Sequence, residues 1–278
     1  RPPSSTPMTP RRQRQMCIRD SSMTMCKILS TLAISLTLLA ANQAYAKSAS
    51  GHEWQFSLAP LFLWGVSTKG TVQAGSATAP LELEFQDDIL ENLEAVLVWH
   101  FEARKNDLSL FVEHQYIDLV PTTVLSTGEP VITGFKNTMV ELGIAYTLFR
   151  NTRADWQIIG GARLTKQILS VNNIPTPPSA FSSFNTSDRW VDAFIGGRVL
   201  AGFAEDWRFI GRADIGTGGS ELVWKLLGLL DYRFANWGSV FFGYKVLDYD
   251  YDNELSGTDR YAYNATQQGP LVGISFYW

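Results

Sequence analysis

The sequence predicts an all-β fold, a transmembrane antiparallel up-and-down β-barrel of about ten strands with both termini periplasmic. Three observations predict it. Several segments alternate between apolar and polar residues, and short turns flanked by aromatic residues alternate with longer polar connections. No apolar run after residue 46 is long enough to cross a bilayer as a helix. A soluble β-sandwich would not place Trp, Tyr and Phe so regularly at the ends of strands.

The clearest alternation lies in residues 221–234. A strand places successive side chains on opposite faces, so one set can meet lipid and the other a polar interior. The outward set is Leu222, Trp224, Leu226, Gly228, Leu230, Tyr232 and Phe234. The inward set is Glu221, Val223, Lys225, Leu227, Leu229, Asp231 and Arg233. The same pattern recurs in residues 140–148, 156–164 and 207–215.

The turns follow a rule that orients the strands. A strand ends in an aromatic residue, polar residues follow, and Asp or Asn with an apolar residue opens the next strand, in residues 101–108, 149–156, 203–207 and 234–237. Longer polar connections lie near residues 67–94, 121–135, 172–188 and 251–268. Short turns at one rim match periplasmic hairpins with an aromatic girdle. Eight or about twelve strands remain open, because residues 71–85 could hold an extra hairpin.

Composition excludes several classes of site and partner. The 278 residues carry a formal net charge of -4 and a mean hydropathy of -0.04, an average that alternating faces produce in a membrane barrel. Mild acidity argues against a nucleic-acid partner. Cys17 and Cys26 are the only cysteines, and both precede the predicted mature start. The mature chain therefore has no disulfide or thiolate metal site, and we expect no cofactor.

The chain divides into three predicted regions. Residues 25–46 have the features of a signal peptide for the Sec pathway: a short charged start, an apolar run and the small-x-small site Ala44-Tyr45-Ala46. Residues 47–278 then form the mature barrel domain. Residues 1–24 resemble translated sequencing-adapter or vector sequence, which predicts a non-native leader; a basic disordered tail is the alternative.

Charged residues recur at positions predicted to face the barrel interior, with both signs interleaved. One hypothesis is a paired network that fills a narrow lumen, because buried charges are tolerated only when paired and hydrogen-bonded. The other is a small selective pore. The predicted inward charges are Glu102, Arg104, Glu113, Glu141, Arg163, Asp192, Arg198, Arg208, Arg212, Asp214, Lys225, Asp231, Arg233 and Lys245.

Catalytic residues for a lipid hydrolase are not apparent. Such enzymes use a Ser and a His with an orienting acid or amide at the membrane rim. The only histidines are His52, His100 and His114. The alternation places His100 in the lumen beside Glu102 and His114 towards lipid or the outer interface. The sequence therefore predicts a non-enzymatic protein, with no catalytic residue assigned.

Asp248, Asp250 and Asp252 alternate near the outer end of a predicted strand. Because they share one side of that strand, they predict a weak site for Ca²⁺ or for the cations that bridge lipopolysaccharide phosphates, since hard cations prefer carboxylate oxygens. The alternative is a solvated acidic loop.

The last residues, 271–278, alternate and stop on an aromatic residue. They resemble the C-terminal signal read by the outer-membrane barrel assembly machinery, with Gly273, Phe276 and Trp278 in the expected places. This resemblance implies that the assembly machinery and periplasmic chaperones are partners.

Three further motifs carry a resemblance to a family. They are Trp54-x-Phe56-x-x-x-Pro60-x-x-x-Trp64, residues 101–105, and Tyr244-x-x-x-Asp248-Tyr249-Asp250-Tyr251-Asp252. The chain resembles poorly characterised proteobacterial outer-membrane barrels of the porin-type group that includes OmpW-like and OmpA-barrel-like proteins. The resemblance implies an outer-membrane location, with the lipid bilayer and lipopolysaccharide as partners.

The predicted function is a structural role in the envelope or the slow passage of small solutes. A small selective porin or a hydrophobic-compound channel is the alternative. A lipid A or phospholipid hydrolase is the more distant alternative.

Overall fold

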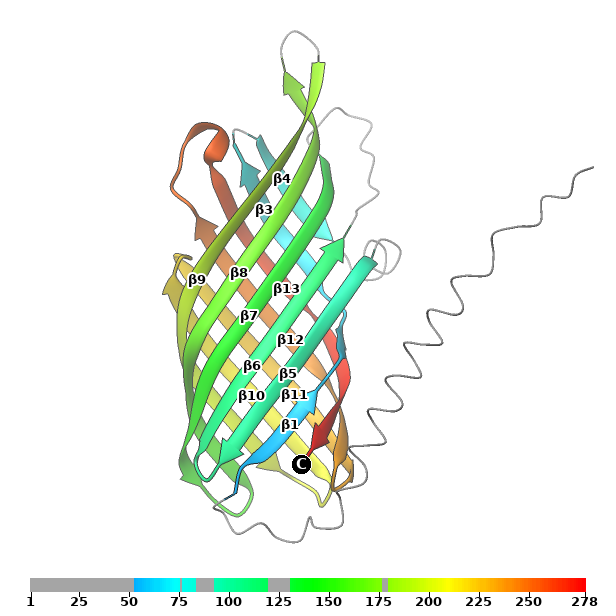
Figure 1. Cartoon of the computed structure of the whole chain (residues 1–278), viewed down its shortest axis with the longest axis vertical. Helices are drawn as coiled ribbons and strands as arrows, with labels where there is room; N and C mark the ends of the chain where they lie inside the picture. Colours follow the sequence, from blue (N-terminus) through cyan, green and yellow to red (C-terminus); the bar gives the residue numbers. More distant parts are fainter. Residues whose placement is uncertain (1–52, 76, 84–92, 120–130, 177–179) are drawn as a thin grey trace, which may run out of the picture. The chain divides into compact units, whose positions relative to one another are not determined.

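The protein is a closed antiparallel transmembrane β-barrel of ten strands, and the start of its first strand and the end of its last strand lie at the periplasmic end (Figure 1). We describe it from a computed structural model, which covers residues 53–75, 77–83, 93–119, 131–176 and 180–278. The predicted leader and signal peptide, residues 1–24 and 25–46, lie outside the described residues. In the part of the chain that is described, no helix is long and apolar enough to cross a membrane.

One sheet of 13 segments forms the wall, and a short 3₁₀ helix, Gly257–Asp259, lies between its last two strands. The first segments are β1 (Gln55–Ala59), β2 (Phe62–Trp64), β3 (Ser67–Ala74) and β4 (Ala77–Leu83). The following four are β5 (Leu93–Lys105), β6 (Leu108–Leu119), β7 (Val131–Arg150) and β8 (Ala154–Thr176). The last five are β9 (Ala180–Gly202), β10 (Trp207–Gly218), β11 (Leu222–Ala235), β12 (Gly238–Asp252) and β13 (Tyr261–Tyr277).

The barrel closes through its first strand, which is broken into three pieces. β1 pairs with β5 on one side and with the end of β13 on the other. Pro60 follows β1 and lacks a backbone N–H, so it cannot donate to the ladder. Beyond it, β2 and then β3 continue along β13. Together β1, β2 and β3 fill one place in the barrel, and β4 is the second arm of a hairpin on β3. The extra hairpin left open for residues 71–85 is this β3–β4 pair.

The periplasmic turns are short because their residues suit tight backbone geometry. Between β5 and β6, Asn106 has a φ of 54°, a conformation that Asn adopts more readily than most residues. Between β7 and β8, the Asn151 side-chain oxygen accepts hydrogen bonds from the backbone N–H groups of Arg153 and Ala154, each 2.8 Å long. Asn side chains commonly fix turns in this way. In these two turns, an asparagine therefore accounts for the short connection that the turn rule predicts.

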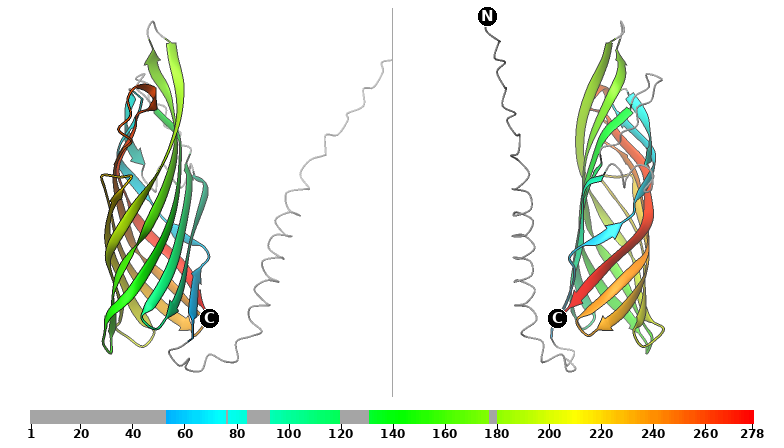
Figure 2. Two further views of the ribbon diagram at one scale, coloured as in Figure 1. Left: turned by 60° about the vertical axis from the view of Figure 1, so that its left-hand side comes forward. Right: turned by 90° about the vertical axis from the view of Figure 1, so that its right-hand side faces the viewer.

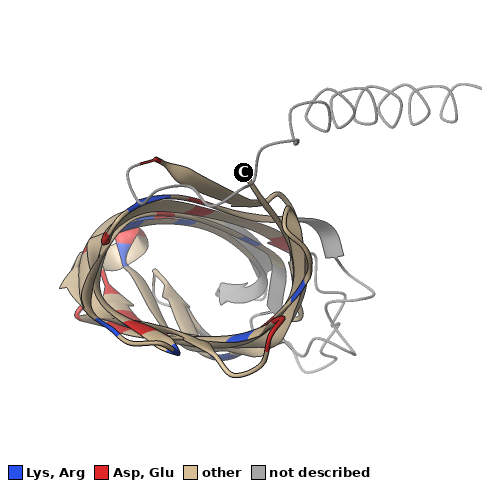
Figure 3. Cartoon of the chain, turned by 90° about the horizontal axis from the view of Figure 1, so that it is seen from below, with Lys and Arg blue, Asp and Glu red and all other residues tan. Residues whose placement is uncertain are grey.

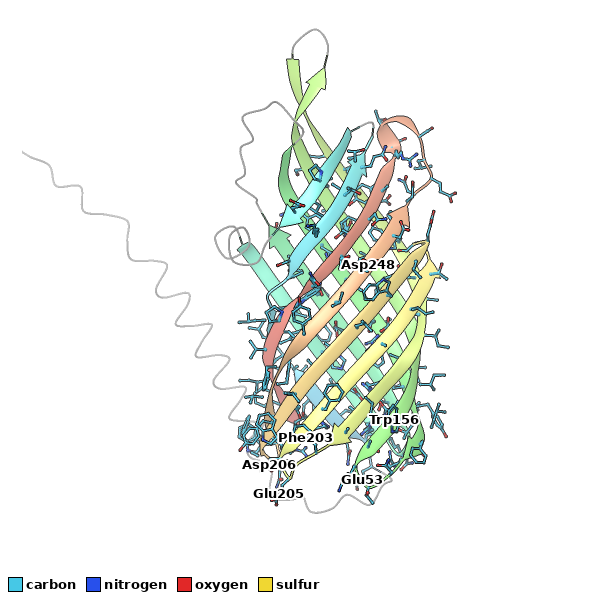
Figure 4. All side chains as sticks on the ribbon, turned by 180° about the vertical axis from the view of Figure 1, so that it is seen from behind. Glu53, Trp156, Phe203, Glu205, Asp206 and Asp248 are labelled. Atoms are coloured by element: carbon cyan, nitrogen blue, oxygen red, sulfur yellow. The ribbon has the colours of Figure 1, made fainter. Side chains whose placement is uncertain are left out.

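The outer surface carries an apolar belt with a boundary at each end. At the periplasmic end, exposed aromatic residues include Phe149, Trp156, Phe203, Phe234 and Trp237; Figure 4 shows Trp156 and Phe203 at that end and Asp248 well above them. At the outer boundary, polar residues face one another on adjacent strands: Lys166 pairs with Arg189, and Asp248 pairs with Thr266, which also pairs with Lys69. On β8 the apolar residues between these limits run from Trp156 to Leu164, about the nine to eleven residues that a tilted strand needs to span a bilayer.

Several strands continue beyond the outer boundary. β8 and β9 are each 23 residues long and form the tallest hairpin (Figure 2). The sequence predicts loops for residues 172–188 and 251–268, but most of these residues extend β8, β9, β12 and β13. Above the membrane an outward side chain meets water, so the apolar alternation that marks a membrane strand disappears while its hydrogen-bond ladder persists.

A row of glycines lets two phenyl rings lie flat inside the barrel. Phe111 pairs with Gly143, Gly143 with Gly161, and Gly161 with Phe194, across four adjacent strands. A Cβ atom on Gly143 would meet the Phe111 ring, and one on Gly161 would meet the Leu142 carbonyl and the Phe194 ring. The absence of side chains at both positions therefore makes room for the rings.

Replacing Gly161 tests this packing. We expect Gly161→Ala to lower the free energy of unfolding by about 1–3 kcal/mol, because the added methyl group overpacks the interior. Urea unfolding of the refolded protein, followed by tryptophan fluorescence, measures the change. Gly197→Ala is the matched control, since a Cβ there meets nothing nearer than 3.8 Å. Equal midpoints for the two variants would contradict the packing role of Gly161.

Candidate functional site

The most highly charged part of the interior centres on Glu141 of β7, whose side chain is fully buried. Three cations reach its carboxylate: Arg163 Nη2 at 2.8 Å, Lys225 Nζ at 2.8 Å and Arg212 Nη1 at 2.6 Å. They come from β8, β11 and β10, so these contacts connect neighbouring and distant strands across the interior. Figure 3 shows both signs of charge around the barrel wall.

Two further carboxylates complete this central network. Asp214 accepts hydrogen bonds from Arg163 Nη2 at 2.8 Å and from Arg212 Nε at 2.7 Å. Glu113 of β6 accepts a hydrogen bond from Lys245 Nζ at 3.0 Å. Because each buried cation has a carboxylate at contact distance, the network meets the pairing condition under which buried charges are tolerated.

Aromatic rings support the guanidinium groups of the network. The Arg212 guanidinium lies 5.2 Å from the ring centroids of both Phe111 and Phe194. The Arg163 guanidinium also lies 5.2 Å from the Phe194 centroid. These distances are within the range for cation–π attraction. The glycine row therefore positions the charges indirectly, by holding the two rings.

A second group of charges lies nearer the periplasmic end. Arg198 makes a bidentate contact with Glu102, with N–O distances of 2.7 and 2.8 Å. His100 lies 3.8 Å from Glu102 and 3.5 Å from Glu113. Arg208 donates hydrogen bonds to Asp231 at 2.9 Å and to the Tyr277 hydroxyl at 3.1 Å.

The remaining members of the predicted set differ in their partners. Arg104 lies 3.6 Å from Asp155, which the sequence analysis did not include. The Arg233 guanidinium stacks 4.8 Å from the Tyr277 ring centroid. Asp192 accepts hydrogen bonds from the backbone N–H and the hydroxyl of Ser220, at 2.7 and 3.0 Å, and so fixes the β10–β11 connection.

Above the charges lies an aromatic layer that the sequence analysis missed. Tyr249 sits at the junction: its hydroxyl is 3.4 Å from the hydroxyl of Thr165, the next inward residue after Arg163 on β8. Trp190 stacks on Tyr251 with ring centroids 3.9 Å apart. The other buried aromatic residues at this level are Phe135, Tyr261 and Tyr263. The alternation of Tyr249, Tyr251, Tyr261 and Tyr263 with polar residues is the sequence signal that could have revealed the layer.

The aromatic layer is uncharged. The Tyr261 hydroxyl donates a hydrogen bond to Gln167 Oε1 at 2.8 Å. Burial raises the pKa of Tyr261 well above its usual value, and burial likewise raises the pKa of Tyr263. Both phenols therefore stay protonated at physiological pH, and the outer half of the lumen is filled by neutral rings.

A cavity of about 390 Å³ lies in the periplasmic half of the barrel. Its walls come from β1, β2, β5, β6 and β9–β13. Lys225, Lys245 and Glu113 line its inner part, and these residues also belong to the central network. The interior therefore has three levels: an aromatic layer outermost, the central charges, and a cavity at the periplasmic end.

The three aspartates proposed for a cation do not converge. Asp248 accepts a hydrogen bond from Thr266, Asp250 from Asn264 at 3.3 Å, and Asp252 from Arg260 at 2.6 Å. Within the described residues, no group of three or more His, Cys, Asp or Glu side chains could hold a metal ion. The structure therefore adds no support to the cation hypothesis.

The other predicted residues lie as follows. His52 is outside the described residues; His100 faces the lumen, and His114 stacks on Trp99 with centroids 5.9 Å apart. A Cβ on Gly273 would meet Phe241 and Phe62, Phe276 stacks on Trp237, and Trp278 stacks on Phe56. The role of these last three positions in assembly stays a prediction.

Comparisons with known proteins give this chain neither a family nor an activity. No family model and no curated protein matches the sequence. Similar solved structures include the outer membrane protease OmpT from Escherichia coli, with a TM-score of 0.45, 8% identity, and 81% of this chain and 96% of that chain covered. Another is Ail, the attachment invasion locus protein of Yersinia pestis, with a TM-score of 0.31, 10% identity, and 81% and 97% covered.

A third similar structure is a Pseudomonas aeruginosa FadL homologue, with a TM-score of 0.38, 8% identity, and 81% and 89% covered. At these values the comparisons assign no activity to this chain. They also give no evidence for or against the resemblance to OmpW-like proteins.

Removing the charge of Glu141 tests the central network. We expect Glu141→Gln to lower the free energy of unfolding by about 3–5 kcal/mol, because three buried cations lose their shared carboxylate. Urea unfolding of the refolded barrel measures it. Glu82→Gln is the control: its partner Lys69 is 3.7 Å away and both side chains are largely exposed, so the expected change is under about 1 kcal/mol. A loss for Glu141→Gln no larger than the control would contradict the network's stabilising role.

Proposed function

We propose that this protein is a non-enzymatic, closed barrel of the bacterial outer membrane with a structural role in the cell envelope. The observation that carries the proposal is the filled lumen. The contacts of Glu141 with Arg163, Arg212 and Lys225 cross the interior within the apolar belt. Immediately above them, the rings of Tyr249 and Tyr263 are fully buried. A barrel of this size is just wide enough for side chains to fill it.

The slow passage of a solute would need movement of both the aromatic layer and the central charges. An ion entering from outside would first have to displace the aromatic layer, which offers neutral rings. It would then have to separate ion pairs that have no exposure to solvent, such as Arg163–Glu141. Separating a buried pair leaves uncompensated charges, which is costly. This favours the structural role over the alternatives of a small selective porin or a hydrophobic-compound channel.

The arrangement of the histidines supports a non-enzymatic role. His100 lies between two glutamates and stacks on Phe111, with ring centroids 5.9 Å apart. His114 stacks on Trp99 on the outer face. Among the described residues, neither histidine contacts a serine hydroxyl, as a nucleophile and base pair requires. The lipid A or phospholipid hydrolase is therefore not supported by the described residues.

The apolar belt and its outer polar boundary are the surfaces that would contact the membrane. Its outward residues would contact the bilayer, and the outer polar boundary at Lys166, Arg189 and Lys69 would contact the phosphates of lipopolysaccharide. Export through the Sec pathway and insertion by the barrel assembly machinery belong to the same proposal. Their support is in the sequence: the predicted signal peptide of residues 25–46 and the C-terminal pattern ending at Trp278.

Electrical recording tests the closed lumen. We expect the refolded mature chain, residues 47–278, to show no single-channel openings in a planar bilayer, because the central charges and the aromatic layer fill the lumen. Heat-modifiable migration on electrophoresis verifies that the silent protein is folded, and a general porin recorded in the same bilayer serves as the positive control.

Steady openings from the folded protein would contradict the closed barrel. If their ion selectivity also changed in Arg212→Gln, the openings would belong to a pore lined by the central charges. That result would establish the selective-porin alternative in place of the structural role.

A further inference from the structure

The periplasmic cavity has two features that a space-filling interior does not require: an excess of cations and an uncovered apolar wall. Seven Lys and Arg side chains line it against three carboxylates, Glu102, Glu113 and Asp231. Six of the seven cations have a carboxylate partner, which lines the cavity for three of them and lies behind its wall for the other three. Lys225 and Arg212, for example, contact Glu141. The space within the cavity is nevertheless bordered mainly by positive groups, which attract an anion.

The cations nearest the periplasmic rim hold unused hydrogen-bond donors. In the described part of the chain, Arg104 Nη2 and Arg208 Nε are buried and have no hydrogen-bond partner. Arg233 has an aromatic contact with Tyr277 and makes no ion pair with a described carboxylate. Guanidinium donors match the planar geometry of a carboxylate. Arg233, which is exposed at the rim, is therefore the group best placed to receive an acidic head group, and Arg104 and Arg208 line the cavity beside it.

An uncovered apolar surface runs along the wall formed by β9, β10 and β11. Leu200 pairs with Ile210, and Ile210 pairs with Leu229, so the three form one inward-facing row. Each is only half-buried although it points into the barrel, and all three line the cavity. Leu227 adds to the same wall. Apolar surface left uncovered in an enclosed space is stabilised when an apolar group displaces water from it.

We propose that this cavity binds a small amphipathic organic anion, a molecule with one carboxylate and a compact apolar body. The carboxylate contacts the arginines near the rim, and the body lies along Leu200, Ile210 and Leu229. The volume of about 390 Å³ is within the usual range of small-molecule pockets. Arg233 and Gln55 are exposed at the periplasmic end, so the ligand enters from the periplasm. A closed barrel does not require such a site, so this inference extends the proposed function.

Calorimetric titration of the refolded full mature chain tests the proposal, with 4-phenylbutyrate as the probe. The neutral 4-phenylbutanamide and the cationic 4-phenylbutylamine have the same apolar body, and titrations into empty micelles correct for partitioning. We expect the carboxylate to bind at least tenfold more tightly than either comparison compound. Equal affinities for the three compounds would overturn the proposal, because the arginines would then contribute nothing.

Two variants separate the two halves of the site. Arg208→Gln combined with Arg233→Gln is expected to weaken carboxylate binding at least tenfold. Ile210→Trp keeps every charge but fills the cavity, and it is expected to abolish binding. Lys166→Gln, on the outer surface at the far boundary of the belt, is the control and should bind as the native protein does. Heat-modifiable migration verifies folding of each variant. Native affinity in a folded Ile210→Trp variant would place the ligand elsewhere and overturn the proposal.

Discussion

The buried carboxylate of Glu141 is the interaction on which the interior depends. It neutralises three cations from three other strands and is the one carboxylate that all three of them contact among the described residues. Arg163 and Arg212 share Asp214 as a second acceptor. Lys225 lies farther from Glu113, at 3.8 Å. The cost of desolvating these groups is met by contacts between neighbouring strands, as for Arg163 and Glu141, together with contacts across the barrel. The network therefore constrains which strands face one another.

The aromatic and glycine positions follow from that requirement. A guanidinium that is buried at mid-membrane needs a flat apolar surface beside it as well as a carboxylate. Phe111 and Phe194 provide that surface, and they lie flat only because Gly143 and Gly161 lack side chains. On the outer side, Tyr249 closes the network with its ring. The same strands thus present an aromatic layer outward and a cavity lined by seven Lys and Arg side chains towards the periplasm.

Much of the fold could be predicted from the sequence because the membrane imposes a period of two. Outward residues such as Leu226 and Ile158 are apolar where lipid surrounds them, and the inward residues Lys225 and Arg163 are charged. For this reason the alternation predicts fourteen charges in the interior. Their pairing could not be predicted, because Lys245 and Glu113 are separated by 132 residues and meet across the lumen.

Other features were beyond sequence reasoning for physical reasons. Above the belt, the outward residues Asn185 and Ser187 of β9 are polar and exposed, so the apolar pattern that identifies a membrane strand ends although β8 and β9 continue. Pro60 interrupts the first strand after Ala59, but the pairing of its later pieces with β13 depends on how the barrel closes. Asp192 has the spacing of a lumen charge, but its partner is a turn residue, Ser220. In each case the outcome is set by a tertiary contact.

The described barrel and the whole predicted mature chain lack cysteine, so a single introduced thiol reports access to the lumen. The most direct test is to label Leu229→Cys, in the periplasmic cavity, with a membrane-impermeant maleimide added to intact cells. Ser256→Cys, on the exposed outer connection, is the positive control. A closed lumen predicts labelling of Ser256→Cys alone in intact cells, and labelling of both once the periplasm is opened. Labelling of Leu229→Cys from outside intact cells would contradict the closed barrel.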